Sequence, residues 1–400
     1  MTAQAGFDIA KNFHWLAVTD DRGHLLSNHR VDNTPEAITE AVAELLAVRD
    51  EYGQVTVGLD ILGGIAGLLT AMLLAAGLRC VHLPGLAVNR ARRGMRGGEN
   101  KSDPRDAKTI AEQVMLRDDL RVVDLPDEQT TELRLLVSHR TTLVKEATAR
   151  TSRLRDLLTG IHPGLERVVD PTSQSGLILL GHYVTAAEIR RAGPARIAAY
   201  LRRHGVSKQT TAQALADAAV AAARAQQVSL PGERRTAALV RELADDLAAG
   251  KARLKTLEAE IEELVTAHPD GALIRSLPGM GAVLTAEFIA AVGDIRRFTS
   301  ADALAAASGV APVLTQSGKV RYSRSATGGD KALKRVFYQA SFCSIQRDPT
   351  SRTYYDRKRA EGKRHHQALI ALARRKVNVL YAMLRDRQPF QHRPPLRLIA

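Results

Sequence analysis

Short runs of apolar residues, separated by polar turns, fill the start of the chain and predict β-strands. Residues 6–10 and 15–18 are two such runs, and a polar turn then leads into a third at 25–31. Residues 54–59 alternate β-branched side chains with polar or small ones, the pattern of a half-buried strand. The chain therefore begins with a predicted β-meander and a further strand, which together indicate an α/β sheet.

Residues 61–78 form an uncharged apolar run of eighteen residues, long enough to raise the alternative of a transmembrane helix. Gly63, Gly64 and Gly67 interrupt this run, and strand-forming segments lie on both sides of it. We therefore expect a helix buried against the sheet, followed by a strand at 79–84, and no contact with a membrane.

The middle of the chain has apolar positions at heptad-like spacing, which predicts two long helices that pair. The pair forms either an antiparallel hairpin within one chain or a coiled coil between subunits, and a coiled coil makes oligomerisation expected. Residues 186–225 are rich in alanine and interrupted at Gly193, Pro194 and Gly205, which predicts a small helical insert. The heptad positions are Leu133, Leu136, Leu143, Ala147, Leu154 and Leu157, then Val240, Leu243, Leu247, Leu254, Leu257, Ile261 and Leu264.

Residues 277–281 read Leu-Pro-Gly-Met-Gly and precede an apolar segment that predicts a helix through Val292 and Phe298. The pattern is similar to the helix-hairpin-helix module, whose glycine turn lets backbone N–H groups approach a DNA phosphate. An ordinary glycine-rich turn between two packed helices is the alternative interpretation.

The chain of 400 residues is long enough for two or three domains with proper cores. We expect an α/β domain at 1–125, a helical region at 126–268 and a mostly helical domain at 269–400. Because Cys80 and Cys343 are the only cysteines, we expect neither a disulfide framework nor a thiolate metal site. A reducing cytoplasm fits this composition, and the first residues do not resemble a secretory signal.

Positive charge is concentrated at the end of the chain. Residues 317–400 contain twenty Lys plus Arg against five Asp plus Glu, whereas the net charge of the whole chain is +14. This density is typical of a surface that binds phosphate backbones, with a merely solvated face as the alternative. The residues assigned to nucleic-acid binding are Lys319, Arg321, Arg324, Arg357, Lys358, Arg359, Lys363, Arg364, Arg374, Arg375 and Lys376.

Pro104 stands at a first helical position and predicts a helix that runs to about Met115. Asp103 and Asp106 then lie on one helical face, with their Cβ atoms roughly 5–6 Å apart. Each also has a structural alternative, because Asp103 suits the N-cap and Asp106 suits the positive end of the helix dipole.

Two further aspartates belong to the predicted sheet. Asp8 lies within the first strand, where no capping role explains it, and Asp60 follows the strand at 54–59. Ligands gather at the carboxyl ends of strands in open α/β sheets. Four carboxylates brought together would repel one another unless a cation neutralised them, and ligation by oxygen alone favours Mg²⁺ or Mn²⁺. The predicted metal ligands are therefore Asp8, Asp60, Asp103 and Asp106.

Residues 308–321 are rich in small, hydroxyl and basic residues, and they predict a flexible loop ahead of a helix that begins near Asp330. Within this loop, Ser317 precedes Gly318, so a bulky phosphate has room beside the hydroxyl. The neighbouring cations would stabilise charge on that phosphate. An ordinary Ser-Gly turn is the alternative.

Taken together, these motifs resemble the DEDD transposases of insertion-sequence family one hundred and ten, most closely the actinomycete branch of these RNA-guided serine recombinases. The resemblance covers nearly all of the chain, and its ordered set of motifs is more specific than any one of them. It rests on residues 7–11, 14–15, 59–60, 84–90, 101–107, 277–281 and 309–319.

The resemblance implies that Asp8, Asp60, Asp103 and Asp106 are the metal-binding acids of a RuvC-like, RNase H-type domain. It implies that Ser317 is the nucleophile, which would hold the cut DNA strand as a phosphoserine ester without any nucleotide cofactor. One departure is that the family's second acid is usually glutamate, whereas this chain has Asp60. The family further implies donor and target DNA, a structured noncoding bridge RNA and a homo-oligomer, either a dimer or a tetramer.

Other functions remain open at this point. A nuclease acting on Holliday junctions would use the same acids with water as the nucleophile, and a DNA-binding regulator would need neither the acids nor Ser317. A tyrosine recombinase is disfavoured because no His-x-x-Arg spacing accompanies Tyr354, Tyr355 or Tyr381.

Overall fold

The computed structural model describes residues 2–95, 98–124, 127–318, 320–324 and 326–392. The chain divides into two compact units, Met1–Pro126 and Asp127–Ala400. The predicted domain boundary after residue 268 falls inside the second unit and stays a prediction. Among the described residues, no helix has both the length and the apolar character needed to cross a bilayer.

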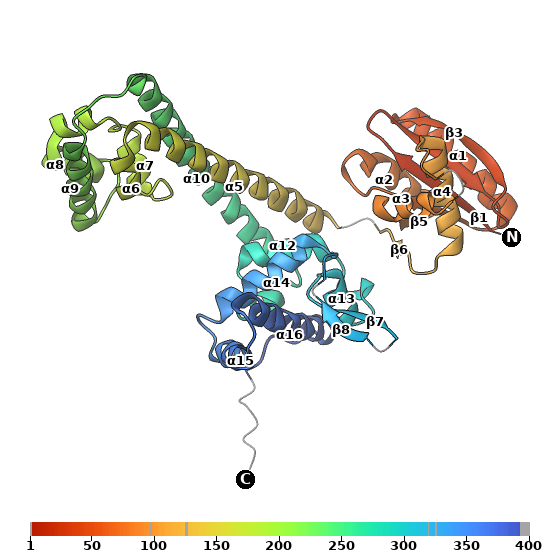
Figure 1. Cartoon of the computed structure of the whole chain (residues 1–400). Coiled ribbons are helices and arrows are strands. Elements are labelled where there is room, and N and C mark those ends of the chain that lie inside the picture. The colour runs from red at the N-terminus through yellow and green to blue at the C-terminus, as the bar shows by residue number, and fades with distance from the viewer. Residues whose placement is uncertain (1, 96–97, 125–126, 319, 325, 393–400) are drawn as a thin grey trace, which may run out of the picture. The chain divides into compact units, whose positions relative to one another are not determined.

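The first unit is built on a six-stranded mixed sheet with the strand order β3-β2-β1-β4-β5-β6 (Figure 1). β1, β2 and β3 form the predicted antiparallel meander, and β4 and β5 continue the sheet in parallel with β1. This confirms the predicted α/β class for the start of the chain. The elements are β1 (Ala3–Ile9), β2 (Phe13–Thr19), β3 (Leu25–Asp32), α1 (Pro35–Tyr52), β4 (Val55–Leu59), η1 (Gly64–Ala66), α2 (Gly67–Ala75), β5 (Arg79–His82), α3 (Gly85–Arg93), α4 (Asp103–Leu116) and β6 (Arg121–Val122).

Helix α4 packs directly on the backbone of the sheet because two strand residues there are glycines. A Cβ atom added at Gly6 of β1 would lie 2.2 Å from the carbonyl oxygen of Ala107, and one at Gly58 of β4 would lie 2.6 Å from Cγ2 of Ile110. Successive residues of a strand point to opposite faces, so Asp8 shares the face of Gly6. The first turn of α4 is thereby held close to Asp8.

The helix predicted across residues 61–78 is shorter in the structure. α2 spans Gly67–Ala75 only and is preceded by the single 3-10 turn η1, because the φ values of Gly63 and Gly64, 73° and 55°, do not fit an α-helix. Leu68 in its first turn is 43% exposed, so the helix is only partly buried against the sheet.

In its described residues, the second unit is helical apart from one hairpin (Figure 1). Its elements are α5 (Glu128–Ile161), α6 (Pro163–Val168), α7 (Gln174–Leu180), α8 (Ala186–Arg203), α9 (Gln209–Ala225), α10 (Glu233–Ala267), α11 (Gly271–Arg275), α12 (Ala282–Val292), η2 (Ile295–Arg297), α13 (Ala301–Ala307), β7 (Val313–Ser317), β8 (Val320–Arg324), α14 (Lys331–Ser344), α15 (Pro349–Ala360) and α16 (His365–Asp386).

The two long predicted helices, α5 and α10, pair within one chain and run antiparallel. Leu133 near the start of α5 shares one core with Ile261 near the end of α10, whereas Leu154 shares another core with Val240. An ion pair between Arg140 Nη2 and Glu258 Oε1, at 2.7 Å, joins the two helices. The hairpin alternative is therefore the one observed, while a coiled coil between subunits stays a prediction.

A separate core lies at each end of this helix pair. At one end α8 and α9 form the predicted helical insert, α6 and α7 pack in the same core, and α8 is kinked at Gly193, which has φ 69°. At the other end, α11 to α14 and α16 enclose the larger core, which includes the T-shaped ring pair Phe288 and Phe337.

The glycine turn at 277–281 joins α11 to α12 and is packed inside the second unit. The predicted helix is shorter than expected, because α12 ends at Val292, before Gly293 with φ 61°, and does not continue to Phe298. Gly279 has φ 91°, and a Cβ atom there would lie 2.1 Å from the carbonyl oxygen of Ala340 in α14. The helix-hairpin-helix assignment stays a prediction, but the structural reason for this glycine is close packing on α14.

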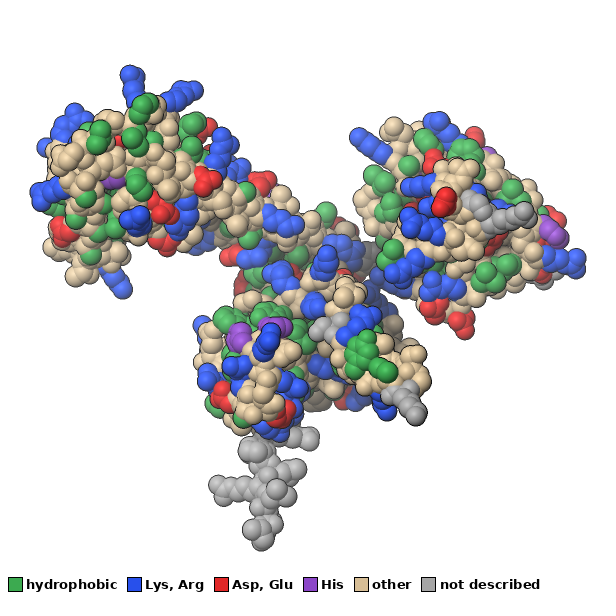
Figure 2. All heavy atoms as spheres, viewed as in Figure 1, with side chains coloured by type: hydrophobic (Ala, Val, Ile, Leu, Met, Phe, Trp, Pro, Cys, Tyr) green, Lys and Arg blue, Asp and Glu red, His purple; other side chains and the backbone are tan. Residues whose placement is uncertain are grey.

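The loop expected at 308–321 is in part a β-hairpin, so that prediction was wrong in its secondary structure. β7 and β8 pair antiparallel, and Ser317 faces Val320 across the turn. Alternation of β-branched or aromatic residues with polar ones, around a glycine with φ 54°, accounts for the two strands. Apolar side chains are exposed on the hairpin (Figure 2): Val320 and Tyr322 lie on one face of it and Leu314 on the other.

Candidate functional site

The acidic site of the first unit is built on two neighbouring strands. Asp8 lies near the end of β1, and Asp60 directly follows β4, which is parallel to β1. The backbone N–H of Ile9 donates a hydrogen bond of 3.2 Å to Asp60 Oδ1. This bond holds the Asp60 carboxylate beside the end of β1.

The other two acids come from the first turn of α4. Ser102 is the N-cap residue, and its side chain makes no capping hydrogen bond. Asp103 is the first residue of the helix, so the alternative of an Asp103 cap was wrong. Asp106 lies one turn further along, with its side chain only 7% exposed. Capping thus leaves the Asp103 carboxylate unexplained.

Electrostatic interactions show that the four carboxylates share one region. Burial raises the pKa of Asp8 to about 7, with further contributions from repulsion by Asp60, Asp106 and Asp103. Burial likewise raises the pKa of Asp60 to about 6, with repulsion by Asp106 added, although the hydrogen bond from Ile9 opposes this rise. The site is therefore a place where positive charge would be stabilised.

A residue that the sequence analysis did not single out, Arg92 of α3, supplies positive charge at this site. Its Nε lies 2.8 Å from Asp106 Oδ1, an ion pair that lacks the geometry of a hydrogen bond. The same guanidinium donates to the carbonyl oxygen of Gly98 at 2.9 Å. The sequence could have indicated that Arg92 is buried, because Arg92 follows Val88 by four residues and so lies on the same helical face as this apolar side chain.

The donor set suits a divalent cation because all four candidate ligands are carboxylates, which Mg²⁺ and Mn²⁺ prefer. The positions of these side chains do not yet form a metal site. Within the described part of the chain, no three His, Cys, Asp or Glu side chains are arranged so that they could hold a metal ion. Asp106 is paired with Arg92, so metal binding by all four acids requires this pair to change.

Ser317 lies in the second unit, at the tip of the β7–β8 hairpin, and is exposed. Arg321 and Arg324 lie on β8, which is exposed along its whole length. Lys319, also predicted to bind nucleic acid, lies outside the described residues. The hydroxyl is accessible, and this unit alone brings none of the four aspartates to it.

The predicted basic residues of α15 and α16 fall into two groups. Arg357, Lys358 and Arg375 gather around the ring of Tyr354, with charged atoms 5.1, 5.7 and 5.3 Å from the ring centroid. Arg374 is instead paired with Asp302. The group around Tyr354 therefore brings basic residues of α15 together with one of α16.

The remaining basic residues differ in exposure. Arg359 and Arg364 are exposed, and Arg359 donates to the backbone oxygen of the half-buried Lys363. Lys376 is only 4% exposed, and its Nζ donates a 2.7 Å hydrogen bond to the carbonyl oxygen of Pro278. Lys376 therefore does not belong to an open phosphate-binding surface, because its helical face packs on the turn at 277–281.

Comparison with known proteins identifies related chains. A family model described as "Transposase", for the DEDD transposases of IS110, matches residues 5–163, and one described as "Transposase IS116/IS110/IS902 family" matches residues 271–356. A 42 kDa protein of insertion element IS900 from Mycobacterium paratuberculosis is 42% identical over 96% of this chain and 95% of its own. A 44.8 kDa protein of insertion element IS116 from Streptomyces clavuligerus is 41% identical over 98% and 96%.

Two weaker likenesses accompany these. The pilin gene-inverting protein of Moraxella bovis is 31% identical over 34% of this chain and 45% of its own length. Among solved structures, RuvC of T. thermophilus in complex with a Holliday junction substrate matches 31% of this chain and all of its own, at 18% identity and a TM-score of 0.24. That TM-score is too low to support an argument about fold or ligand.

Proposed function

Because the chain belongs to the IS116/IS110/IS902 family of transposases, we propose that it is an RNA-guided, site-specific DNA recombinase with a serine nucleophile. The observation that carries the proposal is the gathering of Asp8, Asp60, Asp103 and Asp106 at one end of a mixed sheet. Buried carboxylates that repel one another are costly unless a ligand or neighbouring cation compensates them.

The four aspartates would form the acidic site of a RuvC-like domain and would hold Mg²⁺ or Mn²⁺. Such an ion, when bound, supplies Lewis acidity toward the oxygens of a phosphodiester. Of the protein's own groups, Ile9 N–H orients Asp60, and the close packing of α4 on Gly6 keeps Asp106 near Asp8.

Ser317 would attack the phosphorus atom of a DNA strand. Its Oγ forms a new bond to phosphorus while the bond from phosphorus to one deoxyribose oxygen breaks, and the serine proton ends on that oxygen. The cut strand is then held as a phosphoserine ester, and the reverse reaction with another strand's hydroxyl rejoins DNA. Because the ester conserves the bond energy, no nucleotide cofactor is needed.

Ser317 and the acids lie in different compact units, so the proposal requires that they meet on one phosphodiester. Movement between units or pairing of subunits, as a dimer or tetramer, would achieve this. The pilin gene-inverting relative supports recombination, since inverting a gene requires that DNA be cut and rejoined. In this proposal the chain has three domains, at residues 1–125, 126–268 and 269–400.

The exposed basic residues near the hairpin and on α15 would bind donor and target DNA and the bridge RNA. These polyanions suit the concentration of positive charge after residue 316. The chain has no evident base-reading motif, which is consistent with a guide strand that supplies sequence specificity.

The decisive experiment incubates the protein with Mg²⁺, candidate RNA and labelled DNA, followed by denaturing electrophoresis. The wild type should yield a strand covalently linked to protein, and Ser317→Ala should lose both this adduct and strand cutting. Ser323→Ala, an exposed serine in the opposite strand of the hairpin, is the matched control and should retain the adduct.

The same assay separates the rival functions. If Ser317→Ala still cuts DNA, water is the nucleophile and the protein is a nuclease that uses the acids alone. If Asp8→Asn and Asp106→Asn leave all activity unchanged, the acids have no catalytic role and a DNA-binding regulator is the better description.

A further inference from the structure

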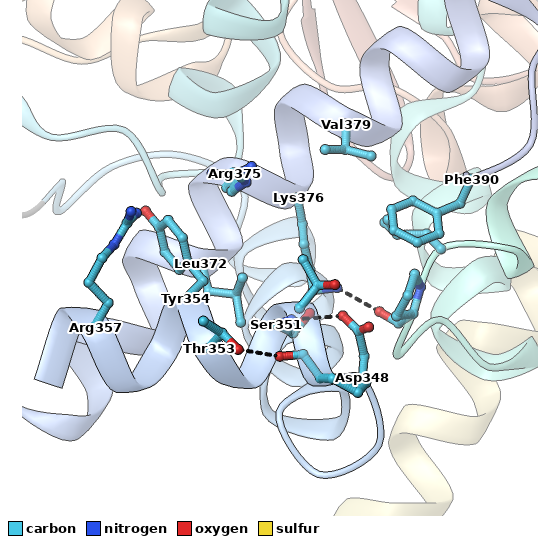
Figure 3. A pocket seen from close by; sticks show the side chains of 14 residues that line it. Asp348, Ser351, Thr353, Tyr354, Arg357, Leu372, Arg375, Lys376, Val379 and Phe390 are labelled. Atoms are coloured by element: carbon cyan, nitrogen blue, oxygen red, sulfur yellow. Dashed lines mark hydrogen bonds between the residues drawn. The ribbon is translucent and has the colours of Figure 1, made fainter. Parts of the chain in front are cut away.

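A cavity of about 490 Å³ lies beside the basic cluster of α15 and α16, and no established property of the chain accounts for it (Figure 3). Its walls are apolar and come from segments far apart in the sequence. Leu277 belongs to the turn before α12, Leu372 and Val379 belong to α16, and Phe390 follows α16. A space of this size and composition is typical of sites that enclose a small organic group.

Two buried charged groups line the cavity and have unused hydrogen-bonding capacity. Asp348 is 6% exposed, and its Oδ2 accepts a 2.9 Å hydrogen bond from the backbone N–H of Ser351. Its Oδ1 has no hydrogen-bond partner, since His392 Nδ1 lies 3.8 Å away. Lys376 Nζ donates to the carbonyl oxygen of Pro278, which uses one of its three N–H bonds. Both residues belong to the wall of the cavity, and Asp348 Oδ1 is closed off from solvent in this conformation.

The rim of the cavity is basic and aromatic. Arg357 and Arg375 are exposed, and both place their guanidinium groups against the ring of Tyr354. Figure 3 shows Tyr354 with Arg357 at one side of the cavity and Arg375 close to Lys376 on α16. Two positive charges therefore stand at the entrance against the ring, with the Glu361 carboxylate 3.8 Å from Arg357 Nε.

We propose that this cavity receives the base of one unpaired nucleotide, while Arg357 and Arg375 bind the phosphates on either side of it. The inference rests on the proposed function, because it names how a nucleic-acid partner would be held. Apolar walls suit the faces of a base, and the two arginines suit the charged backbone that must stay outside.

The polar groups further select the kind of base. In the proposed complex Asp348 Oδ1, which is closed off from solvent without the ligand, becomes accessible and accepts a hydrogen bond from the exocyclic amine of adenine or cytosine. Lys376 Nζ then donates to the adjacent ring nitrogen. Thymine and uracil present a carbonyl oxygen instead of the amine and would leave Asp348 without a partner. A base with an exocyclic amine is therefore preferred.

The test uses ten-residue sugar–phosphate strands that are abasic at every position, and the same strands with a single central adenine. Both deoxyribose and ribose versions are needed, because they distinguish DNA from RNA as the source of the nucleotide. Fluorescence anisotropy with the full-length protein should show that the single adenine raises affinity about tenfold, the scale of one stacked base.

Val379→Trp fills the cavity without changing any charge. It should abolish the gain from adenine while leaving the affinity for the abasic strand unchanged. Asn378→Trp adds the same side chain at the neighbouring exposed position, which does not line the cavity, and should keep the gain. A gain that persists in Val379→Trp, or is absent from the wild type, overturns the inference.

Asp348→Asn provides a second variant that preserves the N-cap of α15. The amide oxygen must accept from Ser351 N–H, so the amide NH₂ takes the place of Oδ1 and turns the acceptor into a donor. The preference for adenine over thymine should then reverse, and an unchanged preference contradicts the role of Asp348. Binding of duplex DNA by the same samples is the separate control. A wild-type protein that did not bind duplex DNA would contradict the proposed function itself.

Discussion

Arg92 Nε and Asp106 Oδ1 lie 2.8 Å apart, and both side chains are only 7% exposed. The buried acid of α4 is thus compensated by a cation from α3. The ion pair joins α3, which contributes the cation, to α4, which contributes the acid, and it lies beside Asp8 and Asp60 of the sheet. The acidic site therefore carries its own positive charge in this conformation.

We predict that Arg92→Gln destabilises the first unit by about 3 kcal/mol in the presence of EDTA, because it leaves the Asp106 carboxylate buried and unpaired. Trp15, the only tryptophan of the chain, lies in β2 and reports unfolding of this unit by fluorescence during urea denaturation. Arg93→Gln removes an exposed arginine from the same helix and should change stability by less than about 0.5 kcal/mol. Equal stability of the two variants would refute the compensating role of Arg92.

Asp8→Asn should have the opposite effect on stability. The substitution removes a buried charge that three neighbouring carboxylates repel, so the metal-free free energy of unfolding should rise by about 1–2 kcal/mol. Any stabilisation that Mg²⁺ or Mn²⁺ gives the wild type should become smaller in this variant. The same Trp15 titrations, run with EDTA and with each metal, measure both effects, and a less stable metal-free variant would contradict the repulsion.

Gly279→Ala should destabilise the second unit by about 3 kcal/mol or more. The added methyl group would overlap the backbone of α14, and the left-handed conformation of this residue disfavours any side chain. Gly281→Ala is the matched control, since a Cβ there meets nothing within 4 Å and its φ is −86°. Urea denaturation followed by circular dichroism compares the two. A folded Gly279→Ala variant that loses only DNA binding would favour the helix-hairpin-helix interpretation instead.

The buried Lys376 should make stability depend on alkaline pH. Burial lowers its pKa to about 8, whereas the unfolded chain keeps the ordinary value of 10.5. Between these values the unfolded state binds more protons, so stability rises with pH from about 8 to 10 by roughly 3 kcal/mol at most. Lys376→Met should lose this rise, and the difference between its urea midpoint and that of the wild type at pH 7 and pH 9.5 measures it. Parallel pH curves for the two proteins would be inconsistent with a lowered pKa.

Local patterns in the sequence correctly indicated the elements that carry the site. The apolar run at 6–10 and the alternating run at 54–59 became β1 and β4, and Pro104 marked the first turn of α4. These predictions succeeded because side-chain periodicity and turn residues act within a few positions of the chain. The family resemblance was confirmed for the same reason, since ordered motifs are a property of the sequence alone.

The position of Lys376 was wrongly predicted, although the helical spacing of apolar residues around it indicates a buried side chain. Lys376 lies four residues after Leu372 and four before Leu380, both buried, so helical spacing already placed it on the packed face of α16. It was assigned to the surface because it stands beside Arg374 and Arg375. The strands of the β7–β8 hairpin were missed because their serine and glycine residues resemble a loop.

The amino-acid sequence by itself determined the family and most of the strands and helices of the first unit, because motifs and side-chain periodicity depend on residues that are close along the chain. The roles of the four acids and of Ser317 stay predictions. Only the tertiary structure decided that Arg92 pairs with Asp106, that α5 and α10 run antiparallel within one chain, and that the cavity beside Tyr354 exists. These features are contacts between segments that are distant in sequence, and the packing of whole elements selects them from many alternatives that local preferences leave equal.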